Sequence, residues 1–169
     1  VAAMRDTVTI PVTVKCRIGV DKDDSVAALH RFVALLENSG CATVIVHARK
    51  AWLSGLSPKQ NREIPPLRYN VVFDLKAAFP DLEIILNGGL ESLDAAQDAL
   101  DYVDGVMLGR TAYKDPWIMS GVDEQFFGDS SAVMGRIEVI EKYIPYIEAQ
   151  LAEGAPLNAM TRHILGLFN

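Results

Sequence analysis

Four apolar runs of this sequence contain or end in side chains suited to binding an anion. Lys15 and Arg17 lie in the first run, and His47 ends the second. The third and fourth runs end in Asn87-Gly88-Gly89 and Gly109-Arg110. Glycines let backbone N–H groups approach an anion closely, and an arginine adds a planar, permanently charged guanidinium. The pattern predicts a phosphate-binding site where the runs end.

A long basic segment follows the second run. It carries Arg49, Lys50, Lys59 and Arg62 against the single acid Glu63, although the chain as a whole has a net charge of -6. Segments of this length inside a compact domain are usually functional or disordered. The overall charge argues against a protein that coats nucleic acid nonspecifically, but it leaves room for a local basic face.

The spacing of apolar residues predicts the elements that position these side chains. We expect strands over residues 8–18, 43–47, 82–86 and 105–108. Helices are expected over residues 25–38, with Ser25 as the N-cap and Gly40 as the stop, and over 69–79 and 92–100. Apolar strands that alternate with helices indicate a parallel sheet covered on both faces. The active site of a parallel α/β barrel lies at the carboxyl ends of its strands.

From Asp115 onward the pattern is helical only. Asp115-Pro116 is a suitable N-cap and first-turn pair, and helices are expected over residues 131–153, with a kink at Pro145, and 158–168. The predicted fold is α/β, a partial TIM (β/α)8 barrel followed by an α-helical appendage. We place the barrel half at residues 1–114 and the helical part at 115–169.

Composition narrows the class of protein further. At 169 residues and 50% hydrophobic content, the chain can bury a core. Its two cysteines, Cys16 and Cys41, are too few for a disulfide scaffold and lack metal-ligand spacing, so a cytoplasmic protein without a metal is expected. No apolar run is long enough to span a membrane. The chain starts without Met and stops in an apolar helical pattern, which we interpret as a fragment.

Several of these segments together resemble one family. They are Val14-Lys15-Cys16-Arg17-Ile18-Gly19, Val46-His47-Ala48-Arg49-Lys50-Ala51, Asn61-Arg62-Glu63-Ile64-Pro65-Pro66-Leu67, Asn87-Gly88-Gly89, Asp104-Gly105-Val106-Met107-Leu108-Gly109-Arg110 and Arg162-His163-Ile164-Leu165-Gly166-Leu167-Phe168. In order and in kind, they resemble the tRNA-dihydrouridine synthases, and the second, third and last resemble the A subfamily. The resemblance covers nearly the whole chain.

The resemblance implies an FMN enzyme that reduces the C5–C6 double bond of D-loop uridines in tRNA, with NADPH as reductant. It places the chain on barrel strands five to eight and the start of the helical tRNA-binding domain. It also implies that FMN is bound by Lys15, His47, Asn87, Gly88, Gly89, Gly109 and Arg110. A cation beside the flavin stabilises its anionic reduced form. Arg62, Lys50, Arg49 and His163 are the expected tRNA contacts.

The chain departs from the family at the proton donor. That donor is a cysteine in an Asn-x-x-Cys-Pro context in the first half of the barrel, and this sequence has no such motif. If Lys15 faces the barrel interior, then Cys16 faces the helices and is a small buried hydrophobe. Cys41 lies in a turn at the opposite end of the strands. We therefore expect no catalytic residue in this chain, and we expect the isolated chain to be inactive.

Each residue also has a structural interpretation. Lys15 could be an edge lysine, His47 a satisfied structural histidine, Asn87-Gly88-Gly89 a plain turn, and Arg110 part of a surface ion pair. Trp52 could pack the loop or stack on a base. Arg162 and His163 could face tRNA or stabilise a helix end. The basic residues of the loop could simply be solvated.

Two other functional classes stay open. One is a barrel enzyme that binds FMN or a sugar phosphate and acts on a small molecule, as a dihydroorotate dehydrogenase does. The other is a noncatalytic RNA-binding fragment. A half-barrel leaves two open sheet edges, so we also expect self-association.

Overall fold

The computed structural model describes residues 1–131 and 133–168. These form two compact units, which are described separately. The first unit consists of Val1–Leu90 and Ala95–Met107, and the second of Glu91–Asp94 and Leu108–Asn169. The predicted boundary at residue 114 separates a barrel half from a helical functional part, and this division stays a prediction.

The first unit is built on four parallel strands in the order β1-β2-β3-β4. They are β1 (Val14–Arg17), β2 (Thr43–His47), β3 (Glu83–Asn87) and β4 (Gly105–Met107). The prediction of an α/β fold with a parallel sheet is confirmed. The first strand is shorter than the predicted 8–18, because Pro11 has no N–H to donate and the residues around it are exposed, Ile10 by 71%.

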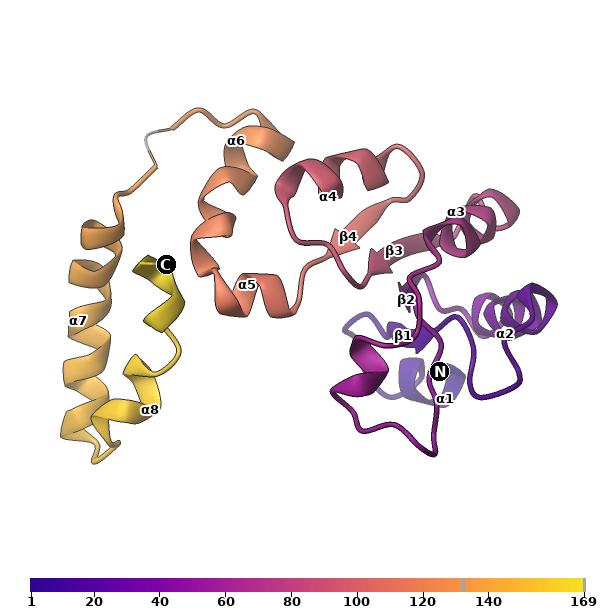
Figure 1. The fold of residues 1–169 in the computed structure, drawn as a ribbon, viewed down its shortest axis with the longest axis horizontal. Coiled ribbons are helices and arrows are strands. Elements are labelled where there is room, and N and C mark those ends of the chain that lie inside the picture. The colour runs from indigo at the N-terminus through magenta and orange to yellow at the C-terminus, as the bar shows by residue number, and fades with distance from the viewer. Residues whose placement is uncertain (132, 169) are drawn as a thin grey trace. The chain divides into compact units, whose positions relative to one another are not determined.

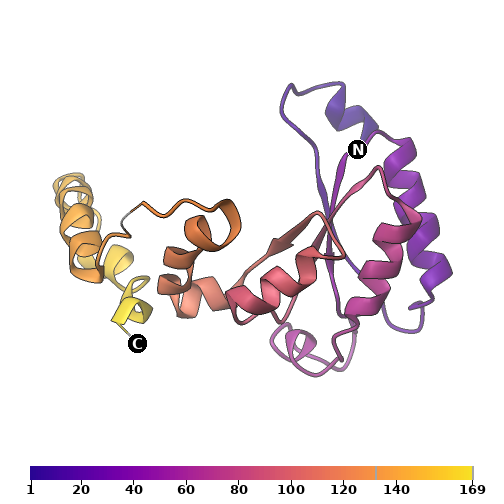
Figure 2. The same ribbon diagram turned by 90° about the horizontal axis from the view of Figure 1, so that it is seen from above.

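Helices α2 (Val26–Asn38) and α3 (Tyr69–Ala78) lie side by side on one face of this sheet (Figures 1 and 2). The predicted cap of α2 is confirmed, since Ser25 Oγ accepts a hydrogen bond from the N–H of Ala28 at 3.1 Å. Gly40 ends the helix with a φ of +78°. The core of the unit is formed by Leu29, Val33, Leu36, Val44, Val46, Val71, Val72, Leu75, Ile84 and Leu86.

The opposite face of the sheet differs from the expectation of cover on both sides. Side chains alternate along a strand, so the residues between the buried Val44, Val46, Ile84 and Leu86 point the other way. That face carries the half-buried Ile45 and Ile85 together with polar side chains nearer the carboxyl ends of the strands, and Lys15 on it is exposed. This is the face on which the candidate site lies. The unit also contains α1 (Ala2–Arg5) and the short turn η1 (Gln60–Arg62), while α4 (Leu93–Leu100) runs from β3 toward β4.

The second unit is helical, as predicted. Its elements are α5 (Arg110–Lys114), η2 (Pro116–Gly121), α6 (Val122–Phe127), α7 (Arg136–Ala152), α8 (Leu157–Thr161) and η3 (Leu165–Phe168). Pro116 opens η2 as expected, although the side chain of Asp115 makes no capping hydrogen bond. Helices α5 and α6 were not predicted, because five or six residues are too few to show a helical period.

Two predicted helices of this unit have different bounds. The helix expected over residues 131–153 begins at Arg136, because the carboxylate of Asp129 accepts hydrogen bonds from the N–H and hydroxyl of Ser131 and so favours a turn there. The helix expected over 158–168 is two pieces. The break falls at residues 162–164, and within η3 a Cβ at Gly166 would lie 1.9 Å from the carbonyl oxygen of Lys114, so only glycine fits there.

Among the helices that the structure describes, none is both long and apolar enough to cross a membrane.

Candidate functional site

The parallel register brings polar residues from three strands into one row. Arg17 pairs with His47, His47 with Asn87, and Asn87 with Met107. Lys15 lies two residues before Arg17 and so shares its face. Three residues predicted to bind a cofactor, Lys15, His47 and Asn87, therefore lie on the same face at the carboxyl ends of neighbouring strands.

A chain of hydrogen bonds fixes the orientation of two of these side chains. Lys15 Nζ donates to Asn87 Oδ1 at 2.8 Å, and Asn87 Nδ2 donates to the carbonyl oxygen of Met107 at 2.8 Å. The amide of Asn87 is buried, so its oxygen is held toward the amine. Burial, and then the positive charge of Arg17, lower the pKa of Lys15 from its ordinary value. The interpretation of Lys15 as a plain edge lysine does not explain this specific partner.

The turn after β3 is closed tightly against the site. Gly88 and Gly89 have φ values of +111° and +70°. A Cβ at Gly88 would lie 2.6 Å from His47 Cδ2, and one at Gly89 would lie 2.3 Å from Leu67 Cδ1. Tyr69 donates its hydroxyl hydrogen to the carbonyl oxygen of Gly88 at 2.7 Å. Only glycine fits at these two positions, so the turn is more than chain punctuation.

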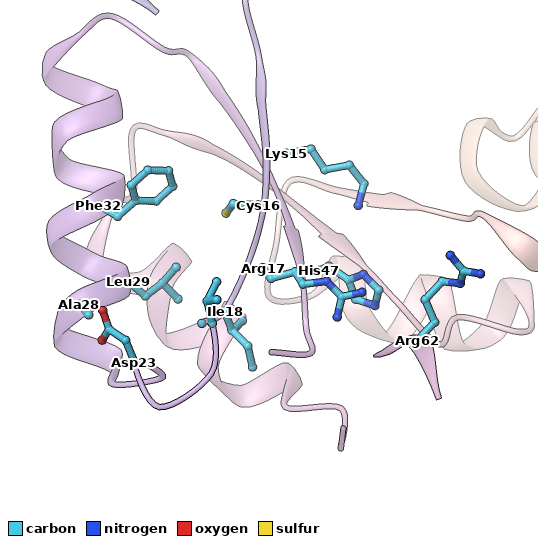
Figure 3. A pocket seen from close by; sticks show the side chains of 12 residues that line it. Lys15, Cys16, Arg17, Ile18, Asp23, Ala28, Leu29, Phe32, His47 and Arg62 are labelled. Carbon is cyan, nitrogen blue, oxygen red and sulfur yellow. The ribbon is translucent and has the colours of Figure 1, made fainter. Parts of the chain in front are cut away.

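A hollow of about 780 Å³ lies along β1, at the open edge of the sheet. On the polar side of the strand it is lined by Lys15, Arg17, His47 and Arg62 (Figure 3). Burial, and then the charges of Arg49 and Arg62, lower the pKa of Arg17. Several cations thus share one concave surface, which is suited to an anionic ligand.

Cys16 points to the other side of β1, toward Phe32 (Figure 3). Burial raises the pKa of its thiol to about 11, so the group stays protonated near neutral pH. Cys41 is buried at the start of β2, where its Sγ lies 3.2 Å from the carbonyl oxygen of Thr43. The prediction that Cys16 faces the helices is confirmed, and neither thiol reaches the row of polar residues.

The segment from Ala48 to Leu67 is called the basic loop below. Two of its predicted tRNA contacts bind the chain itself. Arg49 Nη1 donates to the carbonyl oxygens of Glu63 and Pro65, the former at 3.3 Å. Lys50 Nζ lies 3.0 Å from Asp24 Oδ2 and 4.3 Å from the ring centre of Trp52. These contacts add a structural role for both cations, and their contact with RNA stays a prediction.

In the second unit, Gly109 precedes α5 and Arg110 is its first residue, directly after β4 in the chain. His163 Nδ1 lies 3.0 Å from the hydroxyl of Tyr113, and His163 Nε2 accepts a hydrogen bond from Arg162 Nε at 3.0 Å. His163 therefore connects α5 to the last turns of the unit. Roles for Arg110 toward a phosphate and for His163 toward RNA stay predictions.

Two side chains of the site were missed by sequence reasoning. The sequence marks Tyr69 only as the start of a helix, yet its hydroxyl donates to the Gly88 carbonyl. Asn61 stands out in the sequence only as part of a motif, yet its amide binds both backbone groups of Trp52 in the basic loop. Neither role shows in local periodicity, because both depend on contacts distant in sequence. Within residues 1–131 and 133–168, no cluster of three His, Cys, Asp or Glu residues could hold a metal ion.

The dihydrouridine synthase (Dus) family model matches residues 1–169. The chain belongs to the dihydrouridine synthase family. It is 53% identical over 169 residues to a tRNA-dihydrouridine(20/20a) synthase of Vibrio vulnificus, covering 99% of this chain and 52% of that protein. Proteins of the same name from Pseudomonas putida and Synechocystis are 53% and 50% identical, and the match covers 50% and 51% of their lengths. The chain thus spans about half the length of these curated relatives.

Proposed function

We propose that this chain is part of an FMN-dependent enzyme that reduces the C5–C6 double bond of uridines in tRNA, with NADPH as reductant. The observation that carries the proposal is the row of Lys15, His47 and Asn87 on one face, with the Lys15 amine bonded to the Asn87 amide. Family membership supports the reaction, and the parallel sheet supports its assignment to strands five to eight of a barrel. The division into a barrel half (1–114) and a helical part (115–169) belongs to the same proposal.

The residues present suit a flavin phosphate ester. The row offers an amine, an imidazole and an amide, which together recognise polar edges and negative charge. In the described chain, the N–H groups of Gly88 and Gly89 donate to no protein acceptor, so they are available to an anion. The proposal also includes Arg110 as a phosphate contact, because its guanidinium is permanently charged. FMN bound there would supply the hydride for the uracil ring.

The chain itself would position and charge this site. Asn87, held by the Met107 carbonyl, keeps the Lys15 amine at the row. Lys15, as a cation, stabilises negative charge that develops beside it. Cys16 faces away with a raised pKa of about 11, and Cys41 is buried at the opposite end of β2, so we propose that neither protonates the uracil. The proton donor then comes from outside these residues.

The proposal includes tRNA as the substrate. Arg62 lines the hollow beside Lys15, and Arg49, Lys50 and His163 are further candidates for phosphate contacts. The curated relatives are named for positions 20 and 20a, and we propose the same uridines for this chain. The same names favour a tRNA substrate over the alternative of a barrel enzyme that acts on a small molecule.

The test is uridine reduction in a hybrid protein. This chain would replace the matching segment of the Vibrio vulnificus relative, and dihydrouridine would be measured by mass spectrometry of unmodified tRNA after incubation with FMN and NADPH. We expect reduction that is lost in Lys15→Ala and retained in Lys22→Ala, an exposed lysine outside the site. Equal activity in both variants would refute the assignment of the site. A folded hybrid that binds tRNA but retains no flavin would instead favour the noncatalytic RNA-binding alternative.

A further inference from the structure

The basic loop is folded by side-chain hydrogen bonds rather than by regular structure. Between Ala48 and Leu67, all within the described chain, η1 is the one helical turn. Asn61 Nδ2 donates to the carbonyl oxygen of Trp52 at 2.7 Å and to that of Leu56 at 3.4 Å. Asn61 Oδ1 accepts from the N–H of Trp52 at 2.7 Å. One amide therefore satisfies both backbone groups of a residue nine positions away.

Arg17 ties the same loop to β1. Its Nη1 donates to the carbonyl oxygen of Lys50 at 2.9 Å and to that of Asn61 at 3.0 Å. Lys50 lies near the start of the loop and Asn61 in its second half, so a single guanidinium nitrogen holds two separate parts of the loop together. The positive charge of Arg17 is thus directed at the backbone of its own chain.

The segment after β1 adds further ties. The N–H of Asp21 donates to the carbonyl oxygen of Ala51 at 2.7 Å, and the carboxylate of Asp21 accepts from the N–H of Leu53 at 2.8 Å. Asp21 does this with a φ of +49°, an uncommon conformation for a residue other than glycine. The Lys50–Asp24 ion pair lies beside these bonds. The loop is therefore held from β1, from the segment after it, and from within.

The consequence falls on Arg62. It follows Asn61 directly, so its backbone begins at the carbonyl that Arg17 holds. Its side chain lines the hollow together with Lys15 and His47 (Figure 3). The bonds to Asn61 thus fix the point from which the Arg62 guanidinium enters the hollow.

We propose that Asn61 and Arg17 are positioning residues that set Arg62 in place before RNA binds, so that the basic loop is a preformed contact surface. The inference rests on the proposed function in that it takes tRNA as the ligand of Arg62. A preformed loop has already lost its conformational freedom, so binding does not incur that cost again. Without Asn61 the cost returns at binding, and affinity for tRNA falls while the FMN residues on β1, β2 and β3 keep their geometry.

The first experiment measures tRNA affinity of the 169-residue chain by filter binding. We expect Asn61→Ala to weaken binding on the order of tenfold or more, and Asn70→Ala, an exposed asparagine on α3, to leave it unchanged. If Asn61 acts through Arg62, the double variant Asn61→Ala/Arg62→Ala binds no more weakly than Arg62→Ala alone. Independent, additive losses would overturn the proposal.

A second experiment separates positioning from charge. Arg17→Lys keeps a cation at the hollow but cannot reproduce the contact of one guanidinium nitrogen with both carbonyls. We expect it to weaken tRNA binding as Asn61→Ala does, and an unchanged affinity would refute the role of Arg17.

The fluorescence of Trp52 reports directly on the order of the loop. With Trp117→Phe it is the single remaining tryptophan, and Asn61→Ala should raise the quenching of its fluorescence by acrylamide in the absence of RNA. Equal quenching with and without Asn61 would show that the amide does not order the loop and would overturn the inference. If the wild type binds tRNA and the variants bind it equally well, the inference alone is refuted, whereas a folded hybrid protein that neither binds tRNA nor reduces uridine refutes the proposed function.

Discussion

The substitution Gly88→Ala tests whether the turn after β3 and His47 form one binding surface. The new Cβ would lie 2.6 Å from His47 Cδ2 and 2.8 Å from His47 Nε2. Ordinary contacts between such atoms are about 3.5–4.0 Å, so the imidazole or the turn must shift by roughly 1 Å. Overpacking of this kind costs about 1–3 kcal/mol. The φ of +111° adds backbone strain of about 1–3 kcal/mol.

A matched control isolates the contact with His47. Gly154 also has a positive φ, of +90°, but a Cβ there would meet no atom within 4 Å. Gly154→Ala therefore introduces similar backbone strain without a clash. The difference between the two variants reports on the displacement of His47 and of the turn.

The assay is quenching of FMN fluorescence by the 169-residue chain, together with urea unfolding of each variant. We expect Gly88→Ala to weaken FMN binding by at least about tenfold, or 1.4 kcal/mol, relative to Gly154→Ala. If both variants bind FMN as the wild type does, the turn and the imidazole do not form the flavin site. If Gly88→Ala lowers the free energy of unfolding no more than Gly154→Ala does, the clash itself is relieved without cost.

Four further outcomes follow from the same geometry. Because the pKa of Lys15 is lowered, its charge is lost at a lower pH than that of an ordinary lysine. FMN binding should therefore weaken as the pH rises, and Lys15→Arg should abolish that dependence. The same pH profile in the wild type and in Lys15→Arg would contradict this. Cys16, with a raised pKa of about 11, should react with a thiol reagent at pH 8 far more slowly in the folded than in the urea-unfolded chain; equal rates would contradict its burial. Asp104→Ala should lower the free energy of unfolding by about 1–2 kcal/mol, because the carboxylate accepts from Lys76 Nζ and the N–H of Ile84, both at 2.8 Å. Although burial raises the pKa of Asp104, these bonds lower it overall, so the loss should be present at pH 7 and should shrink as the pH falls below about 4. Light scattering should detect self-association of the isolated chain through the outer strands β1 and β4, and a monomer at all concentrations would refute it.

The elements could be predicted wherever local chemistry decides them. The period of apolar residues located α2, α3 and all four strands, and Ser25 and Gly40 marked the ends of α2 by their own side-chain properties. Prediction failed where contacts between residues distant in sequence determine the local structure. The close approach of Gly166 in η3 to the carbonyl of Lys114 is such a contact, which local spacing does not reveal. The short helices α5 and α6 carry too little periodicity to detect.

The same contrast holds at the site, where sequence predicts which residues share a face but not which side chains bond to one another. Sequence could name the residues on one face of a strand, because alternation alone places Lys15 opposite Cys16, and the structure has that arrangement. It could not say that the Lys15 amine binds the Asn87 amide, since the two residues lie 72 positions apart. Register between strands, rather than spacing along them, makes that contact.

The basic loop shows why a count of cations is a poor guide to nucleic-acid contacts. Arg49 and, from β1, Arg17 donate to backbone carbonyls of the loop, and Lys50 pairs with Asp24. A cation engaged by its own chain must give up these partners, or share them, before it neutralises a phosphate. Salt dependence of binding follows the number of phosphates neutralised, so Arg49 and Lys50 should contribute less to it than a count of cations suggests. These internally bonded cations fix the shape of the loop from which Arg62 enters the hollow, so part of the loop's positive charge serves its fold.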